Sequence, residues 1–319
     1  MSARGIAFKL LGSRSVTAMA VQFTKHRLRI LAYHGIADEA AFGVQLEEIV
    51  HRFTPVSGSQ VAAALAGHSR LPSRAIWLTF DDGFPEVETL GRPLLEAYGI
   101  TATLFVCPGV VDTDEPYWWE IVREAARIGI ADRRGLPVVA SLEFELKTVS
   151  DAQRREVVAA LAAGIEARCK HPYRRTQMAS AQLRNWAAAG QEVGNHTWDH
   201  PLLNQCEGQE QRRQIYRAHE WLRDTLGQAP LSCAYPNGNW ASFAEDELRG
   251  LGYQIALGFD HRLTASESRG LRMSRLRLDT NSSRERFRAV ASGLHPALHA
   301  ARGRLPRATT EVDDRRLPC

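Results

Sequence analysis

The chain has 319 residues, 44% of them hydrophobic and 24% charged, so it is long enough to bury a sizeable core. Its formal net charge of +4 is not concentrated in a block of like charges, and we expect no nucleic-acid partner. The five cysteines are scattered and form no C-x-x-C pair, which argues against a disulfide framework and against a zinc site built from thiolates.

Residues 1–27 are interpreted as an N-terminal extension. Lys9 and Arg14 interrupt its apolar residues, so it lacks the continuous apolar stretch of a signal peptide. No other segment approaches the roughly 18 apolar residues that a membrane span needs. We therefore expect a cytoplasmic protein without a membrane span. Two interpretations of the extension remain open. It is disordered or packed against the protein, or it forms an amphipathic helix that makes peripheral contact with a membrane.

From residue 28 onward, short apolar runs alternate with longer amphipathic segments. The apolar runs predict strands at 29–33, 75–80, 101–106, 192–194, 231–235, 253–258 and 273–278. Helical spacing of apolar residues predicts helices at 43–53, 60–66, 86–98, 178–190, 207–226, 241–251 and 283–293. Strands that alternate with helices are typical of a parallel sheet. No Gly-rich dinucleotide turn follows the first strand, so we predict an α/β fold, a distorted (β/α) barrel of about seven parallel strands.

Residues 112–177 interrupt this alternation and are interpreted as a helical insertion in a domain that spans 28–298. The insertion contains the aromatic cluster Tyr117-Trp118-Trp119, a helix rich in Arg and Glu, and a short β-like piece near Val138. It is either peripheral or a lid over the mouth of the barrel. Residues 299–319 are predicted to form a flexible C-terminal tail.

Two adjacent carboxylates, Asp81 and Asp82, follow the strand predicted at 75–80 in the sequence Thr79-Phe-Asp-Asp-Gly83. Carboxylates at one rim repel each other, which raises a pKa unless a cation lies between them. A metal ion could bind one of them and leave the other free to act as a base. The alternative is a plain Asp-Gly turn.

Two histidines, His196 and His200, follow the strand predicted at 192–194. Their i, i+4 spacing predicts that they lie on one face of a helical turn. Imidazole suits zinc and its neighbours in the transition series, and two histidines with one carboxylate are typical of a catalytic metal site. The alternative is an incidental pair of histidines.

These two motifs resemble those of the polysaccharide deacetylase family, also called NodB-like or carbohydrate esterase family 4, over most of the chain. The resemblance implies a distorted (β/α) barrel with a divalent metal at the rim of the strands. It implies that Asp81 is the catalytic base, and that Asp82, His196 and His200 bind the metal. Zinc is the first expectation for this metal, with cobalt, nickel or manganese as alternatives. Thr197 matches a hydroxyl position that helps to hold the loop.

A third element, residues 233–238, resembles the family's Pro-containing loop. A backbone amide near Asn237 would fit an oxyanion donor, and Tyr235 is a second candidate for oxyanion or substrate binding. Many members carry a base-orienting arginine here, whereas this chain has Ala234. Arg275 on the last predicted strand is the candidate replacement. The alternative for the loop is a plain turn, and the alternative for Arg275 is a surface arginine without a role in the site.

The family's late Leu-x-x-His-Asp motif, which supplies a histidine acid, is not matched near His295 or His299 because no aspartate follows either residue. The segment Leu31-Ala-Tyr-His-Gly35 instead resembles the corresponding element of circularly permuted members. We therefore predict His34 as the general acid, ahead of those two histidines and of His261. The alternative for His34 is a buried core histidine.

The resemblance as a whole implies metal-dependent hydrolysis of an N-acetyl group on an amino sugar. The N-acetylated carbohydrate would belong to a polysaccharide, a glycolipid or its precursor. Two alternatives remain open: an amidohydrolase of the same fold that acts on a non-sugar amide, and a non-catalytic glycan-binding relative. The aromatic cluster of the insertion and Trp198 could stack on sugar rings, or could simply pack.

Overall fold

The computed structural model of the chain describes residues 11–130, 141–264 and 270–302. The β-like piece predicted near Val138 and residues 303–319 of the predicted tail lie outside this part. The described residues form two compact units, one made of segments up to Thr113 and from 177 to 299, the other centred on 114–176.

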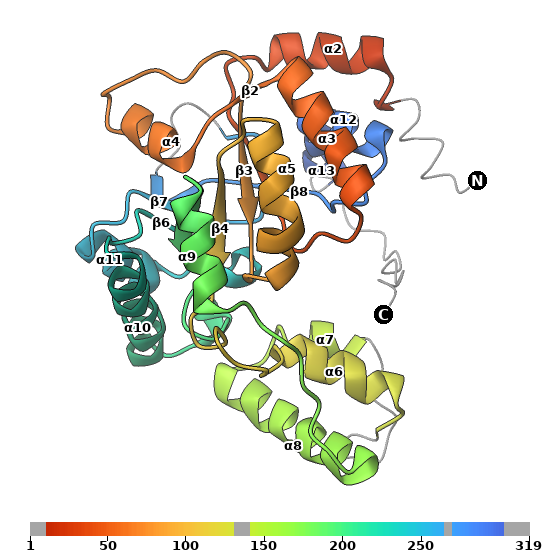
Figure 1. Cartoon of the computed structure of the whole chain (residues 1–319), viewed down its shortest axis with the longest axis vertical. Coiled ribbons are helices and arrows are strands. Elements are labelled where there is room, and N and C mark those ends of the chain that lie inside the picture. The colour runs from red at the N-terminus through yellow and green to blue at the C-terminus, as the bar shows by residue number, and fades with distance from the viewer. Residues whose placement is uncertain (1–10, 131–140, 265–269, 303–319) are drawn as a thin grey trace. The chain divides into compact units, whose positions relative to one another are not determined.

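The first unit is built on a parallel sheet. Its described strands are β1 (Arg29–Tyr33), β2 (Thr54–Pro55), β3 (Ala75–Phe80), β4 (Ala102–Val106), β5 (Glu192–Asn195), β6 (Ser232–Ala234), β7 (Ile255–Leu257) and β8 (Leu276–Arg277). They are ordered β7-β6-β5-β4-β3-β1-β8, with β2 beside β3 (Figure 1). All of these pairings are parallel, as the apolar runs predicted.

The last strand segment closes the sheet on itself. Met273 pairs in parallel with Leu257 of β7, and three residues later Leu276 pairs with Leu31 of β1. The segment from Met273 to β8 therefore connects the two ends of the strand order. This confirms the predicted distorted (β/α) barrel.

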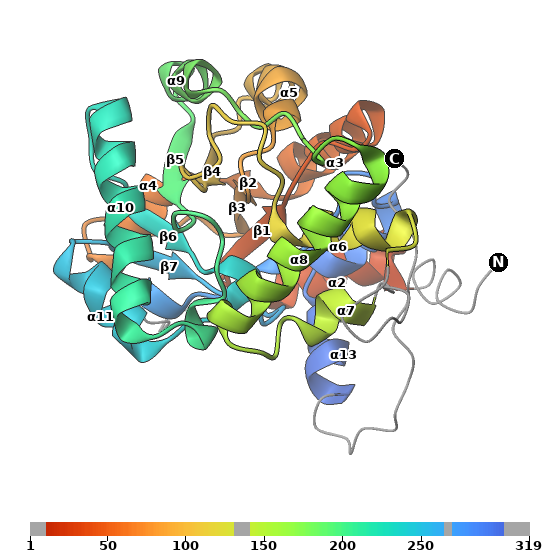
Figure 2. The same cartoon turned by 90° about the horizontal axis from the view of Figure 1, so that it is seen from below.

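Helices cover the outside of the barrel. The described α-helices of this unit are α2 (Arg14–Phe23), α3 (Glu39–Arg52), α4 (Gly58–Leu65), α5 (Arg92–Ala97), α9 (Ser180–Ala188), α10 (Gly208–Leu226), α11 (Ser242–Gly250) and α12 (Arg284–Ala291), and α13 spans Leu294–Arg302. Seen from below, α3, α5, α9, α10 and α11 surround the strands (Figure 2). The helix predicted at 86–98 begins with a π-helical turn, Val87–Gly91. No described helix is both long and apolar enough to cross a bilayer.

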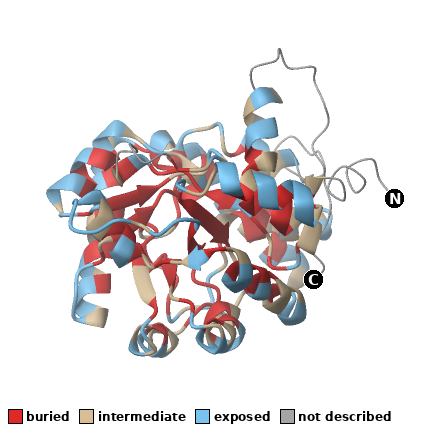
Figure 3. Ribbon diagram, turned by 90° about the horizontal axis from the view of Figure 1, so that it is seen from above, coloured by how far each residue is buried: buried red, intermediate tan, exposed pale blue. Residues whose placement is uncertain are grey.

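The interior of the barrel is filled with side chains. Ile30, Trp77 and Phe105 from three strands belong to one buried cluster. Figure 3 shows the central strands largely in the colour of buried residues, whereas the helices also carry exposed residues. Glu192 of β5 accepts hydrogen bonds from the amides of Gly58 and Ser59, at distances of 2.7 and 2.8 Å. These amides belong to the first turn of α4, so α4 is fixed beside the amino-terminal end of β5.

Strand periodicity places the candidate residues at the opposite, carboxyl-terminal end. Side chains two residues apart share a face of a strand. Counting four residues from Ile30 on β1, Trp77 on β3 and Glu192 on β5 leads to His34, Asp81 and His196. The barrel therefore brings one residue from each motif to the same end of its interior.

The second unit is helical. Its described helices are α6 (Trp118–Arg127), α7 (Ser141–Glu145) and α8 (Asp151–Cys169), which share a small apolar core. The aromatic cluster belongs to this unit: Tyr117 and Trp119 are buried and stack at 4.5 Å between ring centroids, and the Arg154 guanidinium lies over Trp118. All three rings therefore take part in packing within this unit.

The crowded interior makes Gly194 on β5 a sensitive position. A Cβ added there would collide with the Phe105 ring, so we expect Gly194→Ala to lower the free energy of unfolding by about 1–3 kcal/mol. Urea denaturation followed by circular dichroism measures this change. In the matched control Gly43→Ala, on helix α3, the new methyl group meets nothing within 4 Å. A stabilisation of roughly 0.5–1 kcal/mol is expected for this control. Unchanged stability of Gly194→Ala would contradict the packing described.

Candidate functional site

The Asp-Asp-Gly motif turns sharply at the end of β3. Asp82 and Gly83 adopt left-handed backbone conformations, with φ of 72° and 76°. In an extended strand the side chains of Asp81 and Asp82 would point to opposite faces. A non-glycine residue in the left-handed region is uncommon and is typical of functional sites. Both carboxylates are buried at this rim.

Asp82, His196 and His200 converge on one point. Their ligand atoms all lie within 4.8 Å of one another, and the three side chains are buried. The Nε2 atoms of His196 and His200 lie 3.4 and 3.5 Å from Oδ1 of Asp82. Nδ1 of His196 is 2.7 Å from the carbonyl oxygen of Ala234. That carbonyl can only accept, so Nδ1 carries the hydrogen and Nε2 presents its lone pair to the cluster.

The electrostatics of this cluster favour a cation. Burial acts to lower the pKa of His196, but the carboxylates of Asp81 and Asp82 outweigh it and raise that pKa. Burial lowers the pKa of His200 to about 3, so this imidazole is neutral, as ligation requires. One carboxylate and two imidazoles are a donor set that suits zinc and related divalent ions. The residues present therefore fit a divalent metal.

Asp81 is held by a buried fork from Arg275. Nη1 and Nη2 of Arg275 donate to Oδ1 and Oδ2 of Asp81 at 2.6 and 2.8 Å, and Nη1 also donates to Thr79 at 3.2 Å. Arg275 is fully buried, so it is not a surface arginine. Burial acts to raise the pKa of Asp81, but Arg275 and then His196 outweigh it and lower that pKa. Oδ2 of Asp81 lies 4.0 Å from Nε2 of His196. An ionised carboxylate thus stands beside the metal-ligand cluster.

His34 follows β1 and stacks on Phe259, with 6.3 Å between ring centroids. Burial lowers the pKa of His34. The carboxylates of Asp82 and Asp81 act in the opposite direction, and the guanidinium of Arg277 acts with burial. The imidazole is therefore electrostatically coupled to both carboxylates of the site.

The loop between the two histidines is not the helical turn that the spacing predicted, so that prediction was wrong. Thr197 and His200 have φ of 69° and 61°, which a right-handed helix cannot accommodate. Side chains replace the helical hydrogen bonds: the Thr197 amide donates to Oδ1 of Asn195 at 2.7 Å. The next two amides of the loop donate to Oε1 of Gln214, at 3.0 and 3.1 Å.

Gln214 and Asn195 are the supporting residues that the sequence analysis missed. Gln214 is fully buried on α10, and its Nε2 also donates to Oδ1 of Asp199 in the loop at 2.8 Å. Asn195 is fixed in turn because its Nδ2 donates to the hydroxyl of Tyr253 at 2.7 Å. Gln214 could have been noticed in the sequence, because it is a polar residue on the buried face of an amphipathic helix, next to apolar Ile215.

The side chains of the Pro-containing loop bind within the protein. The Tyr235 hydroxyl donates to the carbonyl of Leu271 at 3.1 Å and its amide donates to Leu257 at 3.0 Å, so both donors are used in the core. Asn237 lies at an exposed tip with φ of 55°, and its side chain donates to Asn239 at 3.1 Å.

The competing histidines are engaged with each other. Nε2 of His261 lies 2.8 Å from Nδ1 of His295, and Nδ1 of His261 accepts a long hydrogen bond from the Arg277 amide. The side chain of His299 lies outside the described part of the chain. The pKa of His34, in contrast, is acted on by the carboxylates of both Asp82 and Asp81.

Comparison with known proteins agrees with this geometry. A family model described as polysaccharide deacetylase matches residues 68–132 and 158–256, slightly more than half of the chain. The chain belongs to the polysaccharide deacetylase family. The matched region includes the Asp-Asp-Gly motif and both histidines of the ligand cluster.

Individual relatives match less of the chain. The poly-beta-1,6-N-acetyl-D-glucosamine N-deacetylase of Escherichia coli strain K12 is 31% identical over 124 residues, covering 30% of this chain. The aligned stretch spans only 18% of the length of the E. coli protein, and the same holds for the enzyme of strain O157:H7.

Solved structures of low sequence identity share the fold. The Streptococcus pyogenes deacetylase PplD, in complex with acetate, has a TM-score of 0.57 at 19% identity and covers 81% of this chain and 95% of its own. IcaB from Ammonifex degensii has a TM-score of 0.58 at 17% identity, with coverages of 84% and 97%. These likenesses support the barrel assignment.

Gln214 offers a test of how the histidine loop is held. Gln214→Leu preserves the size of the side chain but removes the acceptor for the loop amides. We expect affinity for Zn²⁺ to fall by about 10- to 100-fold, as for other residues that orient metal ligands. Competition with a chromophoric chelator measures this affinity, and circular dichroism checks folding. Gln209→Leu, at an exposed position of the same helix, is the matched control. Equal affinity of both variants would show that the loop does not depend on Gln214.

Proposed function

We propose that the chain is a metal-dependent carbohydrate N-deacetylase. Its substrate would be an N-acetylated amino sugar of a polysaccharide, a glycolipid or its precursor. The observation that carries the proposal is the buried Asp81–Arg275 fork beside the cluster of Asp82, His196 and His200. The family supports the chemical class, and the E. coli relatives make oligomers of β-1,6-linked N-acetylglucosamine the first substrate to test.

Asp82, His196 and His200 would hold a divalent ion, with zinc as the first choice. This ion would supply Lewis-acid chemistry, because it would polarise the acetamide and lower the pKa of water to about 7. Asp81 would take the proton from the attacking water as its oxygen adds to the carbonyl carbon. Arg275 keeps this carboxylate ionised and fixes both of its oxygens. Thr197, whose hydroxyl position the family resemblance assigns to holding the loop, would help to fix the ligand loop, and its amide donates to Asn195 there.

His34 would donate the proton that the departing amine requires, because an amide anion is a very poor leaving group. Its position at the carboxyl end of β1 and its coupling to Asp81 and Asp82 support this role. The backbone amide of Asn237 is the proposed oxyanion donor. Acetate and a free amino sugar would be the products.

Acetate release from N-acetylglucosamine oligomers by the Zn²⁺-loaded chain tests the proposal directly. We expect Asp81→Asn to lower kcat by about 10²- to 10⁴-fold with unchanged metal content, because it removes the base but none of the three proposed ligands. Circular dichroism checks that the variant, which leaves Arg275 without its carboxylate partner, is folded. Asp82→Asn should instead lose the metal, measured by plasma emission spectrometry. Full activity of Asp81→Asn would contradict its assignment as base. If the chain releases acetate only from a non-sugar acetamide, it is an amidohydrolase of the same fold. If the metal-loaded chain releases no acetate, the result points to a glycan-binding relative.

The pH profile tests the acid. In this mechanism activity falls as pH rises through the pKa of His34, and burial sets that pKa below its ordinary value. Arg277 is an exposed cation that lowers this pKa further. Removing its charge in Arg277→Gln should raise the pKa and move the alkaline limb of kcat/KM to higher pH. Two results together would assign the acid to another group: the alkaline limb stays in place in Arg277→Gln, and it also persists in His34→Gln.

A further inference from the structure

Charge is distributed unevenly between the start of the chain and the rest. The first 37 residues contain six lysines and arginines and no acidic residue, and the first carboxylate is Asp38. The formal net charge of the whole chain is +4, so the remaining 282 residues carry a net charge of −2. The basic character of the protein therefore resides entirely in its first segment.

Helix α2 in this segment turns its large apolar side chains outward. Phe23, Met19 and Val16 are 84%, 61% and 40% exposed, and their spacing of three and four residues places them on one face. The face packed against the protein carries Thr17, which is fully buried, and Val21. A soluble helix ordinarily shows the reverse arrangement, with its largest apolar residues inward.

Polar contacts hold α2 in this orientation. The buried Thr17 hydroxyl accepts a hydrogen bond from Nη2 of Arg52 on α3 at 2.8 Å. Thr24, which ends the helix, donates to the carbonyl of Ser292 at 3.2 Å and accepts a hydrogen bond from Arg29. The apolar face is therefore displayed by a fixed helix.

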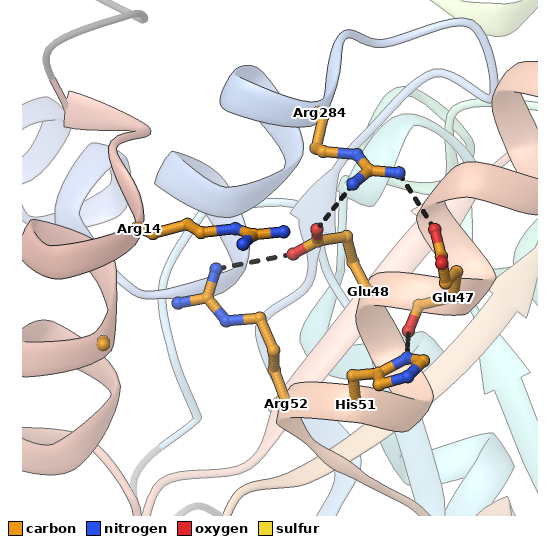
Figure 4. A pocket seen from close by; sticks show the side chains of 7 residues that line it. Arg14, Glu47, Glu48, His51, Arg52 and Arg284 are labelled. Atoms are coloured by element: carbon orange, nitrogen blue, oxygen red, sulfur yellow. Dashed lines mark hydrogen bonds and ion pairs between the residues drawn. The ribbon is translucent and has the colours of Figure 1, made fainter.

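Basic groups flank this apolar face. Arg14 opens the helix, and Lys25 and Arg27 follow its end, the two arginines being exposed. Beside the helix a hollow of about 360 Å³ is lined by Arg14, Arg52 and Arg284 (Figure 4).

The hollow keeps an excess of positive charge. Three guanidinium groups, those of Arg14, Arg52 and Arg284, line it together with the carboxylates of Glu47 and Glu48. Arg52, Arg284 and Arg288 pair with Glu48, and Arg284 also pairs with Glu47. No ion pair of Arg14 is recorded within the described part of the chain.

We propose that α2 docks on a bilayer surface that carries anionic lipid headgroups. Its apolar face, Val16, Met19 and Phe23, enters the boundary between headgroups and acyl chains, while Arg14, Lys25 and Arg27 meet the phosphates. A second copy of the chain is a poorer occupant, because a symmetric contact through α2 would set the same cations against each other. Such docking would hold the barrel at the surface where a lipid-linked sugar resides.

Co-sedimentation of the full chain with vesicles tests this proposal without reference to activity. We expect binding to phosphatidylcholine vesicles containing 30% phosphatidylglycerol, and far less to phosphatidylcholine alone. The double variant Met19→Ser/Phe23→Ser should bind on the order of tenfold more weakly, since it removes the buried apolar contacts. Arg14→Gln/Arg27→Gln should also bind more weakly and lose most of the salt dependence.

The matched control is Phe144→Ser, which removes an apolar side chain of similar exposure on α7. It should bind like the wild type, and circular dichroism should show each variant folded. Equal binding of the α2 variants and the wild type, or none to anionic vesicles at low salt, would overturn the proposal. Concentration-dependent dimerisation lost in Met19→Ser/Phe23→Ser would also overturn it, by assigning the face to a second copy.

Discussion

The buried ion pair between Asp81 and Arg275 links the chemistry of the site to the closure of the barrel. The two residues are 194 positions apart, and both oxygens of the carboxylate are taken by one guanidinium. Leaving either charge buried without the other costs about 3–5 kcal/mol. Arg275 lies between the residues that pair with β7 and with β1. The contact that keeps Asp81 ionised therefore also ties the closing segment to the carboxyl-terminal end of β3.

Much of the fold could be predicted from the sequence, because its signals are local. The apolar runs at 29–33 and 75–80 match β1 and β3, and the Asp-Asp-Gly turn follows directly. Strand periodicity then accounts for the inward direction of Asp81 and His196 without further information. The family resemblance named the same residues that the structure brings together.

What could not be predicted depends on partners distant in sequence. His196 and His200 have a helical spacing, but the backbone of the loop between them is set by hydrogen bonds that its amides donate to Oε1 of Gln214 on a later helix. The burial of Arg275 depends likewise on barrel closure, which no local pattern encodes. The outward face of α2 follows from polar anchors on α3 and near Ser292, so the sequence left its interpretation open.

The position of Arg275 also has a consequence for how the protein is made. A growing chain that has emerged from the ribosome as far as α11 already carries Asp82, His196 and His200, whereas Arg275 is still to come. Until that segment is made, Asp81 lacks its counter-ion and the strand order stays open between β7 and β1. In the proposed mechanism, competence for proton transfer would therefore arrive only with the segment that closes the barrel.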